Sequence, residues 1–83
     1  MEYLSTFKIK GTIVEASVNR FHNHNLWYIN IKNNEGTHLV ALWDDIRNFD
    51  RSKIKVGNEI TVKGNVHNIH GEKISYLRVV EMA

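Results

Sequence analysis

The fold is decided by LWYINIKNNEGTHLVALWDDIRNF (residues 26–49) and IKVGNEITVKG (residues 54–64). Residues 26–31 alternate in the manner of a half-buried strand, with Trp27, Ile29 and Ile31 on one side. Positive φ angles are tolerated by Asn33, Asn34 and Gly36. These residues predict a tight hairpin turn into the next strand, which ends at Trp43. A short helix and a further strand follow. This order predicts an all-β domain, a small five-stranded barrel.

The first strand is expected to be long and bent. Apolar residues at alternate positions from Phe7 to Ile13 share one face, and the opposite phase follows from Val14 to Val18. A phase switch beside a strand glycine, here Gly11, is typical of a β-bulge or a sharp coil. One such strand can serve both halves of a barrel.

The helix is predicted between the third and fourth strands. Asp44 and Asp45 have the chemistry of an N-cap and first turn, and Ile46 and Phe49 would form one apolar stripe that plugs a barrel end. The helix should stop near Ser52. A fourth strand then alternates over residues 60–66, residues 67–71 turn the chain, and a fifth strand covers about residues 73–81.

Length and composition bound the function. The 83 residues, 42% hydrophobic and without cysteine, predict one domain (residues 1–83) with a core that has no disulfide. No signal peptide, membrane span or nucleotide-binding motif is recognisable, so we expect a cytoplasmic protein with no cofactor. No catalytic constellation occurs either, and a barrel this small is filled by its own side chains; we expect a non-enzyme.

These residues and their order resemble the OB-fold, and within it the single-stranded-DNA-binding domains of the replication protein A type. The resemblance covers about residues 6–82, and the anticodon-binding OB domains of tRNA synthetases share much of the pattern. It implies a β-β-β-α-β-β OB-fold barrel that binds single-stranded nucleic acid. The chain departs from the family at Asn33, where an aspartate is frequent, and in having a single OB unit.

Aromatic residues carry the expected binding chemistry. The resemblance puts Val40 and Leu42 inside the barrel and Trp43 at a base-stacking position, because a flat ring can stack on any base. Trp43 could instead fold over the barrel end as core. Phe21, in the polar loop NRFHNHN, either tucks under that loop or meets a base. The outward strand positions complete this set: Tyr28, Asn30, Lys32 and Leu39.

The basic residues divide into two groups. Five could line the groove and meet phosphates: Arg20, Lys32, Lys63, Lys73 and Arg78. Lys8, Lys10, Lys53 and Lys55 have the character of solvated outer faces. Because few phosphate contacts are available and the formal charge is only +2, we expect modest and salt-sensitive affinity.

Four histidines occur in two loops that flank one end of the binding face in an OB-fold: His22, His24, His67 and His70. Converging imidazoles could hold a transition metal, or on protonation could strengthen anion binding. The simpler interpretation is that they are polar loop residues that hydrogen-bond to bases or water, and no metal site is predicted.

Two functions remain open. The first is sequence-tolerant binding of single-stranded DNA, with RNA as an alternative, in replication, repair or recombination. The second is a small protein-interaction subunit of a larger replication or primase-like complex, with Leu39, Ala41 and Trp43 as an apolar docking patch. A monomer or weak homo-oligomer is expected in either case, with no membrane partner.

Overall fold

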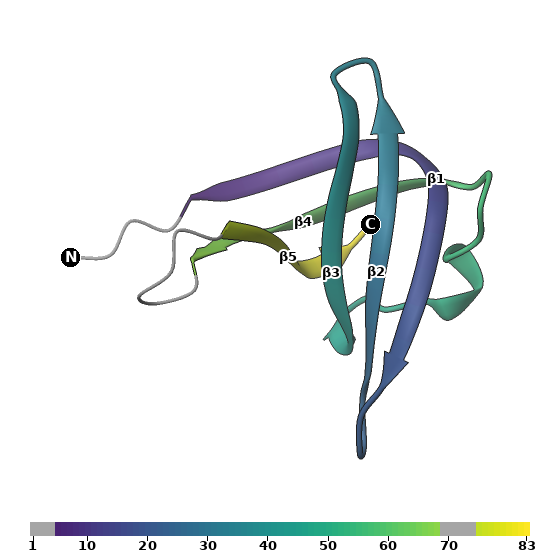
Figure 1. The fold of residues 1–83 in the computed structure, drawn as a ribbon, viewed down its shortest axis with the longest axis vertical. Coiled ribbons are helices and arrows are strands. Elements are labelled where there is room, and N and C mark those ends of the chain that lie inside the picture. The colour runs from purple at the N-terminus through teal and green to yellow at the C-terminus, as the bar shows by residue number, and fades with distance from the viewer. Residues whose placement is uncertain (1–4, 69–74) are drawn as a thin grey trace.

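The computed structural model describes residues 5–68 and 75–83, which form five strands and one short 3-10 turn (Figure 1). The strands are β1 (Thr6–Arg20), β2 (Asn25–Asn33), β3 (Gly36–Arg47), β4 (Glu59–Asn68) and β5 (Ser75–Met82). The turn, η1 (Arg51–Lys53), lies between β3 and β4. The prediction of an all-β chain is therefore confirmed. No helix long and apolar enough to cross a membrane is found among these residues.

The sheet closes in a ring with the order β1-β2-β3-β5-β4, in which β3 and β5 run parallel and every other pair is antiparallel. β1 makes this closure possible. Its first half pairs with β4 from Thr6 to Thr12, and the strand then pairs with β2 from Thr12 to Arg20. Figure 1 shows the bend between the halves. The register shifts between Ile13 and Glu15, so the predicted bulge is present and its extra residue is Val14.

The β2–β3 hairpin was predicted correctly from its turn residues. Asn33 pairs with Gly36 across a two-residue turn, and Gly36 has a φ of 124°, a conformation that favours glycine. The Asn33 side chain braces this region in three ways. Its Oδ1 accepts a hydrogen bond from the Glu35 N–H (2.9 Å) and lies 3.2 Å from His38 Nε2. Its Nδ2 donates a hydrogen bond to the Lys10 carbonyl (3.2 Å).

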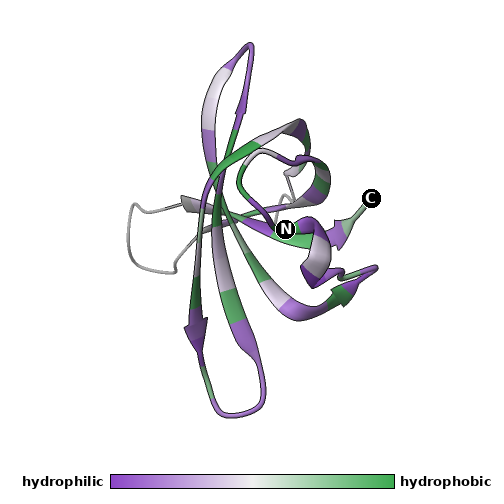
Figure 2. Cartoon of the chain, turned by 90° about the vertical axis from the view of Figure 1, so that its right-hand side faces the viewer, coloured by the Kyte–Doolittle hydropathy of each residue, from purple (hydrophilic) through white to green (hydrophobic). Residues whose placement is uncertain are grey.

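The core lies inside the ring and is entirely apolar among the described residues. The predicted inward positions of β2 and β3 are confirmed, since Ile29, Ile31, Val40 and Leu42 are fully buried. Figure 2 shows the matching alternation of hydrophobic and hydrophilic segments along the strands. The other members of the core are Ile9, Ile13, Ile54, Ile60, Val62, Val79 and Met82.

The predicted helix from Asp44 to Ser52 is wrong. β3 continues through these positions to Arg47, where it pairs with Glu81 of β5, and Asn48 then breaks the strand with a φ of 61°. Propensity was overridden because pairing with β5 holds the chain extended. Ile46 and Phe49 nonetheless pack against the core, as predicted for the helix stripe.

The N-cap that the sequence assigned to Asp44 belongs to Asp50. Asp50 Oδ1 accepts hydrogen bonds from the Ser52 hydroxyl and from the Ser52 N–H (3.0 Å), and together they lower the pKa of this carboxyl below its usual value. Only the three-residue η1 follows. The prediction of an N-cap and first turn at Asp44 and Asp45 is therefore wrong, because both residues lie in β3.

β4 is longer than predicted. His67 and Asn68 belong to the strand, in register with Tyr76 and Ser75, rather than to a turn. The ring centres of His67 and Tyr76 lie 5.3 Å apart. This cross-strand contact stabilises the pairing of β4 with β5 beyond residue 66, where the alternation of apolar residues ends. The remainder of the predicted turn, with the first residues of the predicted fifth strand, lies outside the described residues.

Candidate functional site

The outer side of β2 and β3 carries large apolar side chains that the core does not use. Leu39 is 57% exposed and Tyr28 is 37% exposed. Trp43 is half-buried near the end of β3, opposite Leu26 of β2. Together with Phe21, these three residues (Tyr28, Leu39 and Trp43) form what we call the aromatic face.

Phe21 reaches this face from the β1–β2 loop. Its ring centre lies 5.5 Å from that of Trp43, with the ring planes tilted by 53°, a normal geometry for an aromatic pair. The Phe21 N–H donates to the His24 carbonyl (2.9 Å), which closes the loop on itself. Phe21 is still 54% exposed. The loop ring is therefore neither tucked under the loop nor isolated from the strand tryptophan.

Asp44 fixes the loop beside Trp43, a role that the sequence did not suggest. Its Oδ2 accepts a hydrogen bond from the Asn25 N–H (3.1 Å), and its Oδ1 lies 3.3 Å from His24 Nδ1. Because Asp44 follows Trp43 directly, the end of β3 and the loop are held together. An acidic residue after an outward aromatic was the available signal, but it was taken for a helix cap.

From Tyr28 of the aromatic face, directly paired residues on neighbouring strands form one continuous row on the outside of the sheet. Tyr28 pairs with Ala41, Ala41 with Arg78, and Arg78 with Asn65. Ala41 points outward as predicted but is only 7% exposed, because larger residues flank it on both sides.

The predicted basic groove is distributed over several strands. Lys32 is exposed on β2, Arg78 is exposed on β5, and Arg20 ends β1 next to the loop that carries Phe21. Lys63 lies on β4, directly opposite Lys8 of β1. Lys73 is outside the described residues.

Asn30 and Trp27 have structural partners. Asn30 Nδ2 donates to Glu15 Oε2 (3.4 Å), so its amide is shared with a carboxylate on β1. Trp27 packs partly against the core, as predicted, and the guanidinium carbon of Arg51 lies 6.0 Å from the centre of its ring. These contacts place Asn30 at the border of the aromatic face and remove Trp27 from it.

The histidines do not gather in the part of the chain that the structure describes. His24 contacts Asp44, His22 is exposed in the same loop, and His67 is paired with Tyr76 on β4. Figure 1 places the β1–β2 loop and the far end of β4 at different edges of the molecule. No group of three metal-ligating side chains occurs within residues 5–68 and 75–83. His70 lies outside these ranges.

Comparison of the chain with protein-family models and with curated protein sequences finds no match. The candidate site is therefore characterised by its own residues. It consists of two touching aromatic rings, an exposed leucine and tyrosine, and three exposed cations on β1, β2 and β5. Such a surface can stack flat rings and attract anions.

Proposed function

We propose that this chain is an OB-fold module that binds single-stranded nucleic acid, principally DNA, with little dependence on base sequence. The ring order β1-β2-β3-β5-β4 with parallel β3 and β5 supports the OB-fold assignment. In such folds the outer side of strands 2 and 3 is the surface that binds oligonucleotides. The aromatic face occupies this surface.

The observation that carries the proposal is the Phe21–Trp43 pair. Two adjacent rings, exposed or half-exposed on one surface, form an apolar patch of the kind that is typical of binding sites. Stacking of a base on such a ring contributes about 1–3 kcal/mol and accepts any base, since every base has a π-face. Tyr28 offers a further ring on the same face.

Arg20, Lys32 and Arg78 supply the electrostatic part of this proposed interface. All three are exposed, and no ion pair with a carboxylate engages them within the described residues. Their charges would meet the phosphates and release counterions, so binding should weaken as salt rises. The small number of cations limits the affinity of an isolated domain.

A second candidate function is protein docking on the same face, and Leu39 favours it. A leucine exposed by 57% beside Tyr28 gives no stacking, yet it suits an apolar contact with a partner of a larger assembly. A partner that covers Leu39 would also cover Trp43. The two functions are distinguished by whether the free chain binds an oligonucleotide.

In the test, the chain is titrated into a fluorescent oligo-dT of about 15 nucleotides, a length within the usual range for one OB domain. Trp43→Phe keeps a stacking ring, whereas Trp43→Leu keeps an apolar side chain against Phe21 without one. We expect Trp43→Phe to bind within about threefold of the natural chain. Trp43→Leu should bind roughly 5- to 100-fold more weakly, the equivalent of one lost stack.

Val56→Ala is the matched control, because Val56 is an exposed apolar residue in the turn between η1 and β4. Equal binding by Trp43→Leu and Val56→Ala would contradict the stacking role. No binding by the natural chain at tens of micromolar protein would refute the autonomous nucleic-acid function and favour the protein-docking alternative.

A further inference from the structure

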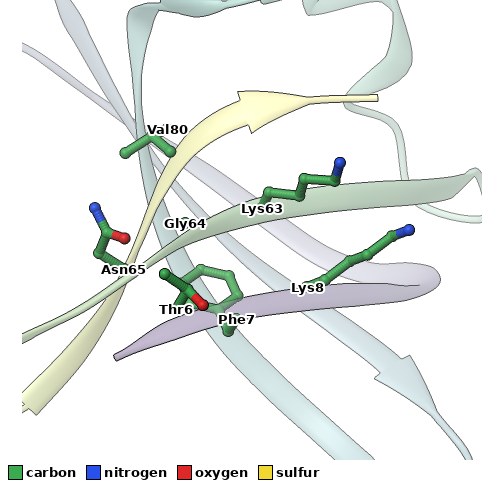
Figure 3. Close-up of a pocket in the computed structure, with 7 residues that line it drawn as sticks. All are labelled: Thr6, Phe7, Lys8, Lys63, Gly64, Asn65 and Val80. Carbon is green, nitrogen blue, oxygen red and sulfur yellow. The ribbon is translucent and has the colours of Figure 1, made fainter. Parts of the chain in front are cut away.

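A shallow pocket of about 360 Å³ lies away from the aromatic face, where β1, β4 and β5 meet. Phe7, Gly64 and Val80 give it apolar surface, and Thr6 and Asn65 add polar groups. Val80 reaches the pocket because it is the extra residue of a bulge, at the point where the β4–β5 register shifts between Lys63 and Gly64. Figure 3 shows these side chains around the opening.

Two lysines complete the pocket. Lys8 and Lys63 are directly opposite one another on antiparallel strands, and their side chains extend in the same direction in Figure 3. Like charges at such positions repel and destabilise the pair. Neither lysine has an ion-pair partner in residues 5–68 and 75–83, whereas Lys10, two residues along β1, pairs with Glu59 at 3.2 Å. Glu81 of β5 lies opposite Lys63 on its other side, but no ion pair joins the two, so an anion in the pocket would relieve the repulsion between the lysines.

The pocket is connected to the aromatic face by the row of outward residues. The row runs from Tyr28 through Ala41 and Arg78 to Asn65, and Asn65 pairs with Thr6 at the pocket wall. Four strand-to-strand steps span about 19 Å of the outer surface. Arg78 lies between the two sites, so a cation stands midway along the path.

We propose that Lys8 and Lys63 hold backbone phosphates of the same strand whose bases stack on the aromatic face, so that the nucleic acid continues past Arg78 and wraps part of the closed sheet. This inference rests on the proposed function. It assigns a phosphate-binding role to Lys8, which acts together with Lys63. It also divides the interface into a stacking half and an electrostatic half.

The test compares two oligo-dT probes, of about 5 and about 15 nucleotides, in the range of site sizes known for OB domains. The pocket variant is the double substitution Lys8→Gln/Lys63→Gln. Its matched control is Lys53→Gln/Lys55→Gln, which removes the same charge from exposed positions around the η1 turn. Both variants should remain folded, because all four side chains are exposed and the pocket variant also loses a repulsion.

We expect the two variants to bind the short probe equally. On the long probe the pocket variant should bind about three- to tenfold more weakly than its control, as for the loss of two exposed charge contacts. Its slope of log affinity against log salt should also fall by about 1.4, the value for two phosphate contacts to a single strand. In NMR spectra, the Gly64 amide should shift with the long probe and not with the short one.

Equal binding of the long probe by the pocket variant and its control would overturn the inference and leave the aromatic face intact as a binding site. Failure of the natural chain to bind either probe would refute the proposed function and this inference together. A peptide rich in Asp and Glu tests whether the pocket instead binds an acidic protein. If it bound the natural chain and lost affinity only in the pocket variant, with oligonucleotide binding unchanged, the pocket would belong to a protein partner instead.

Discussion

The aromatic face and the lysine pocket occupy outward positions of the same closed sheet, yet aromatic rings dominate the first and two lysines the second. On β2 and β3 the outward positions near the β1–β2 loop hold Tyr28 and Trp43. On the first half of β1 and on β4 they hold Lys8 and Lys63. Neither region contributes its outward side chains to the core. The two regions show that outward positions with no role in the core can carry different binding chemistry on one sheet.

The two regions also differ in how the backbone presents them. The aromatic face is completed by a loop that hydrogen bonds hold against the strand through Asp44. The pocket has no such loop among the described residues and depends on close strand packing at Gly64 and a bulge at Val80. We therefore expect substitutions in the loop to act locally and a substitution at Gly64 to act on the whole sheet.

Gly64→Ala should have the largest effect. A Cβ at this position would lie 1.9 Å from the Arg78 carbonyl oxygen and 2.7 Å from Cζ of Phe7, so β4 and β5 would have to separate. We expect the free energy of unfolding to fall by about 3 kcal/mol or more. Chemical denaturation measures this loss. Gly36→Ala is the comparison, because its Cβ would meet nothing within 4 Å and only its φ of 124° would be strained.

Phe21→Ala should separate the two halves of the aromatic face without unfolding the chain. We expect oligo-dT affinity to fall by about 1–2 kcal/mol, within the range that one base–aromatic stack contributes. Stability should change by less than 1 kcal/mol, because the ring is more than half exposed. Unchanged affinity in a binding titration would restrict stacking to Trp43.

Asp44→Ala should loosen the loop. The substitution leaves the Asn25 N–H without its acceptor and removes the contact with His24, at a cost of about 1 kcal/mol in the free energy of unfolding. Amide hydrogen exchange at Asn25 should accelerate, while exchange in β4 should not. Acceleration throughout the sheet would contradict a purely local anchor.

Lys8→Glu should stabilise the pocket region. The substitution converts a like-charge pair across β1 and β4 into an opposite-charge pair with Lys63, which we expect to raise the free energy of unfolding by about 0.5 kcal/mol. Lys8→Gln removes the repulsion without adding attraction, so its free energy of unfolding should lie between those of the natural chain and Lys8→Glu. The gain should decrease with added salt in denaturation experiments, since both side chains are exposed.

Asp50→Asn should have the smallest effect, and one that depends on pH. Hydrogen bonds from Ser52 lower the pKa of Asp50 in the folded chain below its ordinary value of 3.8. Its carboxylate therefore adds stability above about pH 4, and this contribution disappears as the pH falls through the lowered pKa. The stability difference between the natural chain and the variant should be constant from pH 7 to pH 5 and shrink below pH 4. A difference that grew on acidification would contradict this sign.

The strands of the central hairpin could be predicted because their evidence is local. Alternation along β2, the turn residues before Gly36 and the apolar end of β3 each indicate structure within a few positions. The bulge at Val14 was equally visible as a change of phase. The helix could not be excluded in this way, because Asp44 and Ile46 suit a capped helix as well as a strand. Only the pairing of Arg47 with Glu81 excludes it.

The candidate site divides along the same line. The outward phase of Tyr28 and the loop position of Phe21 follow from the sequence pattern. The outward position of Trp43, in contrast, was expected only from the resemblance to the OB-fold, because residues 39–43 are all apolar. That Phe21 lies against Trp43, and that Asp44 holds them in place, depends on a loop crossing to a strand about 20 residues away. The juxtaposition of Lys8 and Lys63 depends on pairing across a still longer separation.

The sequence by itself determined the strand content, the hairpin, the bulge and the division of side chains between core and surface. These follow from periodicity and from the conformational limits of single residues, which act over a few bonds. The tertiary structure alone decided where β3 ends, what Asp44 binds and which lysines share a pocket. Those outcomes depend on strands that are distant in sequence, and their register is set by burying the whole apolar ring at once.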